Sequence, residues 1–175
     1  MIGAQEKKIR RIMIAAPKSG SGKTMITCGL LQIFKENGEN ISSCKCGPDY
    51  IDPMFHKAVL DIPSRNLDLF FISEREVRGQ IVRSIPQNGL GVIEGVMGFY
   101  DGVSGTTDTA SAAHLARETG TPAILVVRPK GQSLSLAAML SGFRNFTENT
   151  LCGVVLNGIS DAMYPFYRDI VQKSG

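Results

Sequence analysis

The chain has 175 residues, of which 43% are hydrophobic and 20% are charged, and its formal net charge is +3. This size and composition indicate one globular domain, residues 1–175, with a sizeable core. The small net charge gives no argument for a nucleic-acid partner, and no segment holds the roughly 18 apolar residues that span a bilayer. Charged residues stand where a secretory signal has its apolar stretch, so we expect a cytoplasmic protein. We interpret the early basic run as a solvated entrance to the first strand; it consists of Lys7, Lys8, Arg10 and Arg11.

Strand and helix patterns alternate along the chain. Strands are predicted at 10–16, 41–46, 90–94, 122–127 and 151–157. Helices are predicted at 23–37, 73–85, 109–119, 132–145 and 161–173. The later strands are continuous apolar runs, which are typical of a parallel sheet covered on both faces. Ser73 and Glu76 form a capping box, and Gly120 ends a helix before Pro122. The alternation predicts a three-layer α/β fold with a mostly parallel, doubly wound sheet.

The loop after the first strand, residues 17–24, reads PKSGSGKT. It matches the phosphate-binding pattern G-x-x-x-x-G-K-[ST] except at Pro17, which stands where that pattern has Gly. Pro lacks an N–H, which is tolerable if the phosphate-facing amides come from residues 20–24. Lys23 would reach the β- and γ-phosphates, and the Thr24 hydroxyl would ligate Mg²⁺. Because a helix N-terminus follows, the loop predicts nucleotide binding rather than an ordinary Gly/Ser turn, and the fold is that of a P-loop NTPase.

A second polar segment, KCGPDYIDPMFH at 45–56, follows the second strand. A Gly-Pro turn would present Asp49, Tyr50 and Asp52 together. Asp49 could join a Mg²⁺ shell of oxygen ligands, and Lys45 could neutralise phosphate or a substrate carboxylate. Asp52 is equally well explained as the cap of a helix that begins after Pro53. A lone histidine at position 56 is more typical of packing than of catalysis.

Glu94 ends the hydrophobic strand at 90–94 and leads into the glycine-rich stretch GVMGFYDG at 95–102. In phosphate-loop enzymes, a carboxylate at this position holds the metal or its water. Ligands of such sheets bind beyond the carboxyl ends of the strands. Glu94 and the phosphate loop should therefore lie on one rim, which favours a metal role over that of a hydrated surface carboxylate.

The four cysteines, Cys28, Cys44, Cys46 and Cys152, have no C-x-x-C or paired Cys/His spacing. Cys44 and Cys46 are two residues apart on a predicted strand, which places them on the same face. We expect reduced, buried thiols rather than a metal site.

Several segments together resemble the N-terminal domain of the cobyrinic acid a,c-diamide synthases, a family similar in fold to dethiobiotin synthetase. These segments are residues 16–24, 45–56, 64–68, 94–102 and 156–157. The phosphate loop alone is shared with many enzymes, whereas the segments at 47–56 and 94–102 are much more specific. In this family, a proline at the first loop position is expected.

The resemblance implies an ATP- and Mg²⁺-dependent ligase that amidates the a and c acetate carboxylates of a corrinoid through an acyl phosphate. It implies nucleotide binding by Ser19, Gly20, Ser21, Gly22, Lys23, Thr24 and Asn157. The Mg²⁺ ligands would be Thr24, Asp49 and Glu94, and the substrate side would hold Lys45, Tyr50, Asp52, Tyr100 and Asp101. It implies catalytic roles for Lys23, Asp49 and Glu94. For Lys18, a catalytic role is a further hypothesis, and a solvent-exposed lysine without such a role is the alternative.

The family normally continues into a glutaminase domain whose cysteine nucleophile releases ammonia. No cysteine here lies in a nucleophile elbow, and the histidines are His56 and His114. Glutamine hydrolysis is therefore not encoded in these residues, and we expect a fragment of a longer protein whose C-terminal glutaminase domain is the partner.

Two alternatives stay open. The first is a dimeric ATP-driven switch of the partitioning or metal-cluster-carrier type, which the loop and Lys18 would fit but which does not require the segments at 47–56 and 100–101. The second keeps the ligase chemistry and changes the tetrapyrrole, for example to a nickel-containing sirohydrochlorin. The oligomeric state also stays open, with a homodimer among the possibilities.

Overall fold

The computed structural model describes residues 9–173, and the strands in this range form one parallel sheet. The sheet order is β3-β2-β4-β1-β5-β6, so β1 lies between β4 and β5. The strands are β1 (Arg10–Ala15), β2 (Ile41–Cys46), β3 (Ser64–Leu67), β4 (Leu90–Glu94), β5 (Ala123–Val127) and β6 (Leu151–Leu156). Since all strands run the same way, their carboxyl ends meet at one rim, where open α/β sheets bind ligands.

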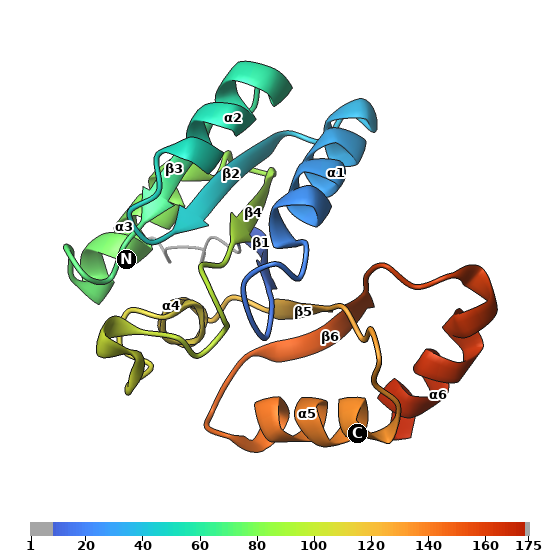
Figure 1. Cartoon of the computed structure of the whole chain (residues 1–175). Helices are drawn as coiled ribbons and strands as arrows, with labels where there is room; N and C mark the ends of the chain where they lie inside the picture. Colours follow the sequence, from blue (N-terminus) through green and yellow to red (C-terminus); the bar gives the residue numbers. More distant parts are fainter. Residues whose placement is uncertain (1–8, 174–175) are drawn as a thin grey trace, which may run out of the picture.

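Helices cover both faces of the sheet, as the sequence predicts (Figure 1). On one face, α1 (Lys23–Glu36) and α2 (Ile51–Leu60) contribute to a core cluster that includes Ile14, Leu31 and Val92. The other face carries a larger cluster around Met13, Ile93 and other buried side chains. Its helices are α3 (Glu74–Ser84), α4 (Ala112–Thr119), α5 (Leu134–Asn145) and α6 (Tyr164–Lys173). Among the described residues, no helix combines the length and apolarity that would be needed to cross a membrane.

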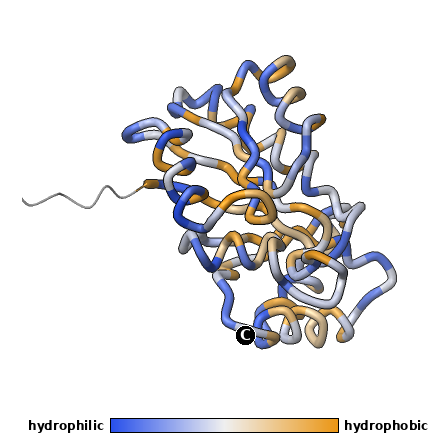
Figure 2. The backbone as a smooth tube through the Cα atoms, turned by 90° about the vertical axis from the view of Figure 1, so that its left-hand side faces the viewer, coloured by the Kyte–Doolittle hydropathy of each residue, from blue (hydrophilic) through white to orange (hydrophobic). Residues whose placement is uncertain are grey.

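The hydropathy pattern explains the layers. Hydrophobic segments run through the middle of the molecule, and hydrophilic stretches lie mostly toward its outside (Figure 2). Ile26, Leu30 and Phe34 recur at helical spacing and pack against the cluster that includes Ile14, Leu31 and Val92, so they form the inward face of α1. The Ser73–Glu76 capping box is also confirmed, with both reciprocal hydrogen bonds present. Gly120 ends α4 in the left-handed conformation that glycine tolerates.

Two elements are absent from the predicted strands and helices, namely β3 and α2, although a helix after Pro53 was one interpretation of Asp52. In addition, three predicted helices begin later than expected. Helix α4 begins at Ala112 because Ala110 has a positive φ and Ser111 caps the helix. Helix α5 begins at Leu134, and the segment expected as a helix from 161 begins with a short 3₁₀ turn, Asp161–Met163, before α6. In the predicted basic run, Arg11 donates to Thr121 and to backbone carbonyls rather than facing solvent, while Lys7 and Lys8 lie outside the described residues.

The prediction that the cysteines are buried is confirmed for two residues and wrong for the other two. Cys44 and Cys46 are buried on the same sheet face, and burial raises the pKa of each thiol to about 12. Cys28 is only half-buried and Cys152 is exposed, because Cys152 lies on the edge strand β6. All four are free thiols.

Candidate nucleotide and metal site

The phosphate-binding loop connects β1 to α1 at the rim of the sheet. The Ser21 hydroxyl donates to the Lys18 carbonyl at 3.0 Å, which closes the loop on itself. Gly22 has a φ of 97°, which a residue with a side chain rarely adopts. Helix α1 begins directly at Lys23, so the free N–H groups of its first turn and its dipole favour an anion at this point.

Lys23 is buried, and its ammonium donates to the Met97 carbonyl at 2.6 Å. This contact ties α1 to the glycine-rich loop after β4. Burial is the main cause that lowers the pKa of Lys23, and the nearby Lys45 charge acts in the same direction, while Glu94 and Asp101 oppose both. The sequence did not indicate the Met97 carbonyl as a partner.

Thr24 and Glu94 meet directly, because the Thr24 hydroxyl donates to Glu94 Oε1 at 2.6 Å. The sheet register places Lys45 of β2 opposite Glu94 of β4, and Lys45 Nζ lies 3.0 Å from the same Oε1. Lys45 also pairs with Asp52 Oδ2 at 2.5 Å and lies 3.8 Å from Asp49 Oδ2. Burial opposes the charged form of Lys45, but its bonds to Asp52 and Glu94 outweigh burial and raise its pKa. The ammonium thus occupies the centre of a carboxylate cluster.

The Asp49 carboxylate binds the first turn of helix α2 from the position before the N-cap residue, Tyr50. Its Oδ1 accepts from the backbone N–H of Ile51 at 2.8 Å and from that of Asp52 at a longer 3.4 Å. The helix therefore begins at Ile51, two residues before Pro53, and the interpretation of Asp52 as the cap is wrong. Because Oδ1 serves the helix, Oδ2 is the Asp49 oxygen that faces Lys45. These bonds fix the direction of this carboxylate toward the cluster.

His56 packs under the cluster rather than at the surface, which agrees with the packing role expected of a lone histidine. It is fully buried, Ser43 Oγ lies 2.8 Å from its Nδ1, and its Nε2 lies 3.9 Å from Glu94 Oε2. Burial lowers the pKa of His56 against the opposing charge of Glu94. The contact with Glu94 was not foreseen, since a single histidine in a sequence does not reveal its neighbours.

A depression of about 380 Å³ joins most of these groups. Its lining includes Ser19, Gly20, Gly22, Lys23, Thr24, Lys45, Asp49, Glu94, Gly95, Val96 and Met97. An adjoining depression of about 430 Å³ is lined by residues 18–21 with Arg128 and Lys130. The exposed Lys18 therefore lies beside two other basic residues. The first depression combines an anion-binding helix terminus with oxygen ligands suited to a hard cation.

Other predicted residues lie around this depression. The Asn157 amide donates to the Ser21 carbonyl at 2.9 Å, so Asn157 touches the loop itself. Tyr50 is exposed at the start of α2, and Asp101 accepts from the Gly98 N–H at 2.8 Å. The structure does not bring Tyr100 to the carboxylate cluster. Its hydroxyl donates to the Phe143 carbonyl at 2.6 Å, and its ring packs on α5.

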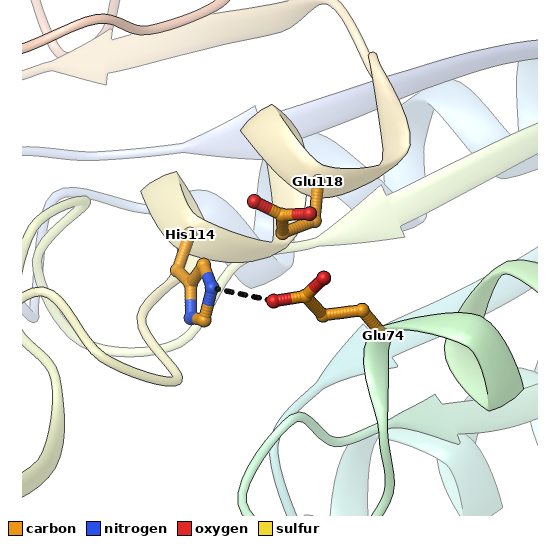
Figure 3. A group of neighbouring side chains, drawn as sticks. All are labelled: Glu74, His114 and Glu118. Carbon is orange, nitrogen blue, oxygen red and sulfur yellow. Dashed lines mark ion pairs between the residues drawn. The ribbon is translucent and has the colours of Figure 1, made fainter.

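Three side chains of types that can bind metals lie where α3 and α4 meet (Figure 3). None of them lines the depression at the phosphate loop. Glu74, His114 and Glu118 place one ligand atom each within 4.8 Å of one another. Arg78 already bridges the two carboxylates, at 3.2 Å from Glu74 and 3.1 Å from Glu118. The Ala110 N–H donates to His114 Nδ1 at 3.0 Å, so the neutral ring carries its proton on Nε2, the atom that faces Glu74. The group is therefore a salt-bridge network that ties two helices together.

The chain matches the model of the CobQ/CobB/MinD/ParA nucleotide binding domain over residues 12–174. It is 43% identical over 167 residues to the cobyrinate a,c-diamide synthase of Clostridium acetobutylicum, which covers 94% of the chain and 37% of that relative. It is 48% identical over 149 residues to the enzyme of the same name from Gloeobacter violaceus, covering 85% of the chain and 33% of the relative.

A third relative is named for a related substrate. The hydrogenobyrinate a,c-diamide synthase of Mycobacterium tuberculosis is 39% identical over 162 residues, covering 90% of the chain and 35% of the relative. The chain thus spans about a third of the length of these curated relatives. The family model covers nearly the whole chain and includes the phosphate loop, Asp49, Glu94 and Asn157. The chain therefore belongs to the CobQ/CobB/MinD/ParA nucleotide binding domain family.

Proposed function

We propose that the chain is the ATP-binding synthetase domain of a ligase that amidates the a and c acetate carboxylates of a corrinoid. The observation that carries this proposal is the meeting of Lys23 and Thr24 with Lys45, Asp49 and Glu94 around one depression. Such a site combines phosphate binding with carboxylates that can hold a cation. The names of the relatives supply the corrinoid substrate and the amidation.

In this proposal, the helix N-terminus and Lys23 hold the phosphates of ATP, and Thr24, Asp49 and Glu94 hold Mg²⁺. The donor set fits this ion, because Mg²⁺ takes hydroxyl and carboxylate oxygens. A cation already sits among these oxygens in the form of the Lys45 ammonium. Bound Mg²⁺ would neutralise charge on the transferred phosphoryl group.

The reaction begins when a substrate carboxylate oxygen attacks the γ-phosphorus of ATP, which releases ADP and forms an acyl phosphate. Ammonia then attacks the carbonyl carbon, inorganic phosphate leaves with the C–O bond electrons, and the nitrogen loses a proton to give the amide. A carboxylate is a poor electrophile, and phosphorylation supplies the leaving group. The residues of the chain bind and orient the two reactants and neutralise charge, and Lys18, which is exposed on the phosphate loop, would be an additional cation.

The corrinoid would lie over the start of α2. Tyr50 and Asp52 belong to this region, and Ile51 and Met54 add apolar side chains that are 78% and 68% exposed. An apolar surface beside charged groups suits a macrocycle that carries carboxylates. Lys45 and Asp101 are the other proposed contacts. Tyr100 would contribute through the position of its loop, since its hydroxyl serves Phe143.

Ammonia would come from a glutaminase domain, which we place in the part of the relatives that this chain does not match. The acyl phosphate can be tested without that domain. The protein is supplied with cobyrinic acid, ATP, Mg²⁺ and hydroxylamine, and the corrinoid products are analysed by mass spectrometry. A corrinoid hydroxamate formed together with ADP is expected. ADP formed without any hydroxamate would reject carboxylate activation.

A further inference from the structure

His56 and Glu94 face each other in the floor of the site. Both side chains are completely buried, and His56 Nε2 lies 3.9 Å from Glu94 Oε2. Neither of these two atoms has a hydrogen-bond partner among the described residues. Buried polar atoms in native proteins nearly always find a partner, so two such atoms that face each other form a pair that closes with a small shift.

The other side of the imidazole ring is fixed by two hydroxyl groups. Ser64 Oγ donates to Ser43 Oγ at 3.3 Å, and Ser43 Oγ lies 2.8 Å from His56 Nδ1. Ser64 Oγ itself lies 3.5 Å from Nδ1, so two hydroxyl groups are in position to donate to that nitrogen. The neutral ring then carries its own proton on Nε2, which is the nitrogen that faces Glu94. The chain of contacts from β3 through β2 thus presents an N–H group to the carboxylate.

Glu94 uses its two oxygens on opposite sides. Oε1 accepts from Thr24 at 2.6 Å and lies 3.0 Å from Lys45 Nζ. Oε2 points toward the ring of His56. A carboxylate held at only one oxygen can rotate about its χ angles, whereas one held at both keeps Oε1 directed at Thr24. Second contacts of this kind orient the residues that bind metals in proteins.

We propose that His56 is a positioning residue that holds Glu94 Oε2 through Nε2–H, so that Oε1 stays directed toward Thr24 and the metal position. This inference rests on the proposed Mg²⁺·ATP site. His56 also lies in the helix whose first turn Asp49 binds. The same residue therefore links α2 to β4 and couples the placement of two proposed metal ligands.

The test compares two amides of different length. In His56→Gln, the side-chain amide nitrogen can take the place of Nε2 and donate to Glu94. In His56→Asn, the shorter amide reaches the place of Nδ1 near Ser43 and leaves Glu94 Oε2 without a donor. The two variants remove the same ring, so a purely structural loss affects both. Affinity for ATP is measured by titration calorimetry with Mg²⁺ and again with EDTA, and folding is followed by thermal unfolding.

We expect His56→Gln to keep the gain in ATP affinity that Mg²⁺ provides. His56→Asn should lose on the order of 10- to 100-fold of that gain, the usual effect of removing an outer contact of a metal site. Affinity in EDTA should be the same for both. Equal Mg²⁺ dependence in both variants, or unfolding of both, would assign His56 to packing and overturn the proposal. Because the readout is nucleotide binding, it stays separate from a failure of corrinoid amidation.

Discussion

The Asn157 side chain donates a 2.9 Å hydrogen bond to the Ser21 carbonyl, which joins the end of β6 to the phosphate-binding loop. The same amide lies so close to Gly22 that an added Cβ would stand 2.2 Å from its Nδ2. The loop is therefore shaped from two sides, by the positive φ of Gly22 and by the amide that closes over it. Asn157 acts on the shape of the loop in addition to its proposed contact with the nucleotide.

Gly22→Ala should weaken ATP binding and destabilise the fold. A side chain at a φ of 97° costs about 1–3 kcal/mol, and the new methyl group also displaces Asn157. Chemical unfolding and ATP titration measure the two effects. Gly29→Ala is the matched control, because a Cβ there meets no atom within 4 Å and the position lies inside α1. That control should be stabilising by roughly 0.5–1 kcal/mol. Equal behaviour of the two variants would contradict the strained conformation at Gly22.

Lys45→Met should destabilise the protein by about 3–5 kcal/mol, because it leaves the buried Glu94 and the partly buried Asp52 without their cation. Urea unfolding measures the loss. The control is Lys173→Met, since Lys173 pairs with Asp169 where both side chains are more than half exposed. That pair should contribute only about 0–1 kcal/mol. A change at Lys45 no larger than the change at Lys173 would show that the carboxylate cluster does not depend on the ammonium.

Asp49 carries two roles that substitution can separate. Asp49→Asn keeps an oxygen that binds the first turn of α2 but loses the charge, so stability should stay within a few tenths of a kcal/mol while Mg²⁺-dependent ATP binding falls. Asp49→Ala loses both roles and should also lower the free energy of unfolding by about 1 kcal/mol. Thermal unfolding and calorimetric titration measure the two properties. Full Mg²⁺·ATP affinity in Asp49→Asn would remove Asp49 from the metal ligands.

The cysteines should differ in reactivity and in their effect on stability. Cys152 is exposed and should react with iodoacetamide in the folded protein, whereas Cys44 and Cys46 should react only after unfolding. Burial raises the pKa of both from 9.0 to about 12, so the native state keeps protons that the unfolded state releases. Stability from these thiols is complete below pH 9 and decreases as the pH rises toward 12. Alkylation followed by peptide mass spectrometry checks the order of reaction, and labelling of Cys44 before unfolding would contradict it.

The apolar strands were predictable because buried parallel strands have continuous hydrophobic sequences. Strand β3 has no such signal, since Ser64, Arg65 and Asn66 precede a single buried Leu67 at the edge of the sheet. Helix α2 was foreseen only as an alternative, for a different reason. Pro48 and Pro53 indicate a turn, and the apolar residues of the helix, including Ile51 and Met54, face outward. Because these apolar residues do not pack on the core, their pattern does not indicate a buried helix face.

The candidate site was predictable for residues close to the carboxyl end of a strand. Glu94 is the last residue of β4, and Thr24 lies at the start of α1, after the loop that follows β1. Their mutual hydrogen bond follows from the order of β1 and β4 in the sheet. The pairing of Lys45 with Glu94 depends on strand register, and the position of His56 depends on helix α2, whose start at Ile51 was not foreseen. Contacts that depend on strand register or on the exact position of a helix cannot be predicted from a single sequence.

The most direct measurement is amidation itself. The protein is prepared as this chain and also joined to the remainder of the Clostridium acetobutylicum relative. Each is supplied with cobyrinic acid, ATP, Mg²⁺ and ammonium, and product mass is followed over time. Conversion of two carboxylates to amides is expected, with loss of activity in a folded Glu94→Gln variant. ATP-dependent dimerisation without amidated corrinoid, or full activity in Glu94→Gln, would contradict the proposed ligase and its metal site.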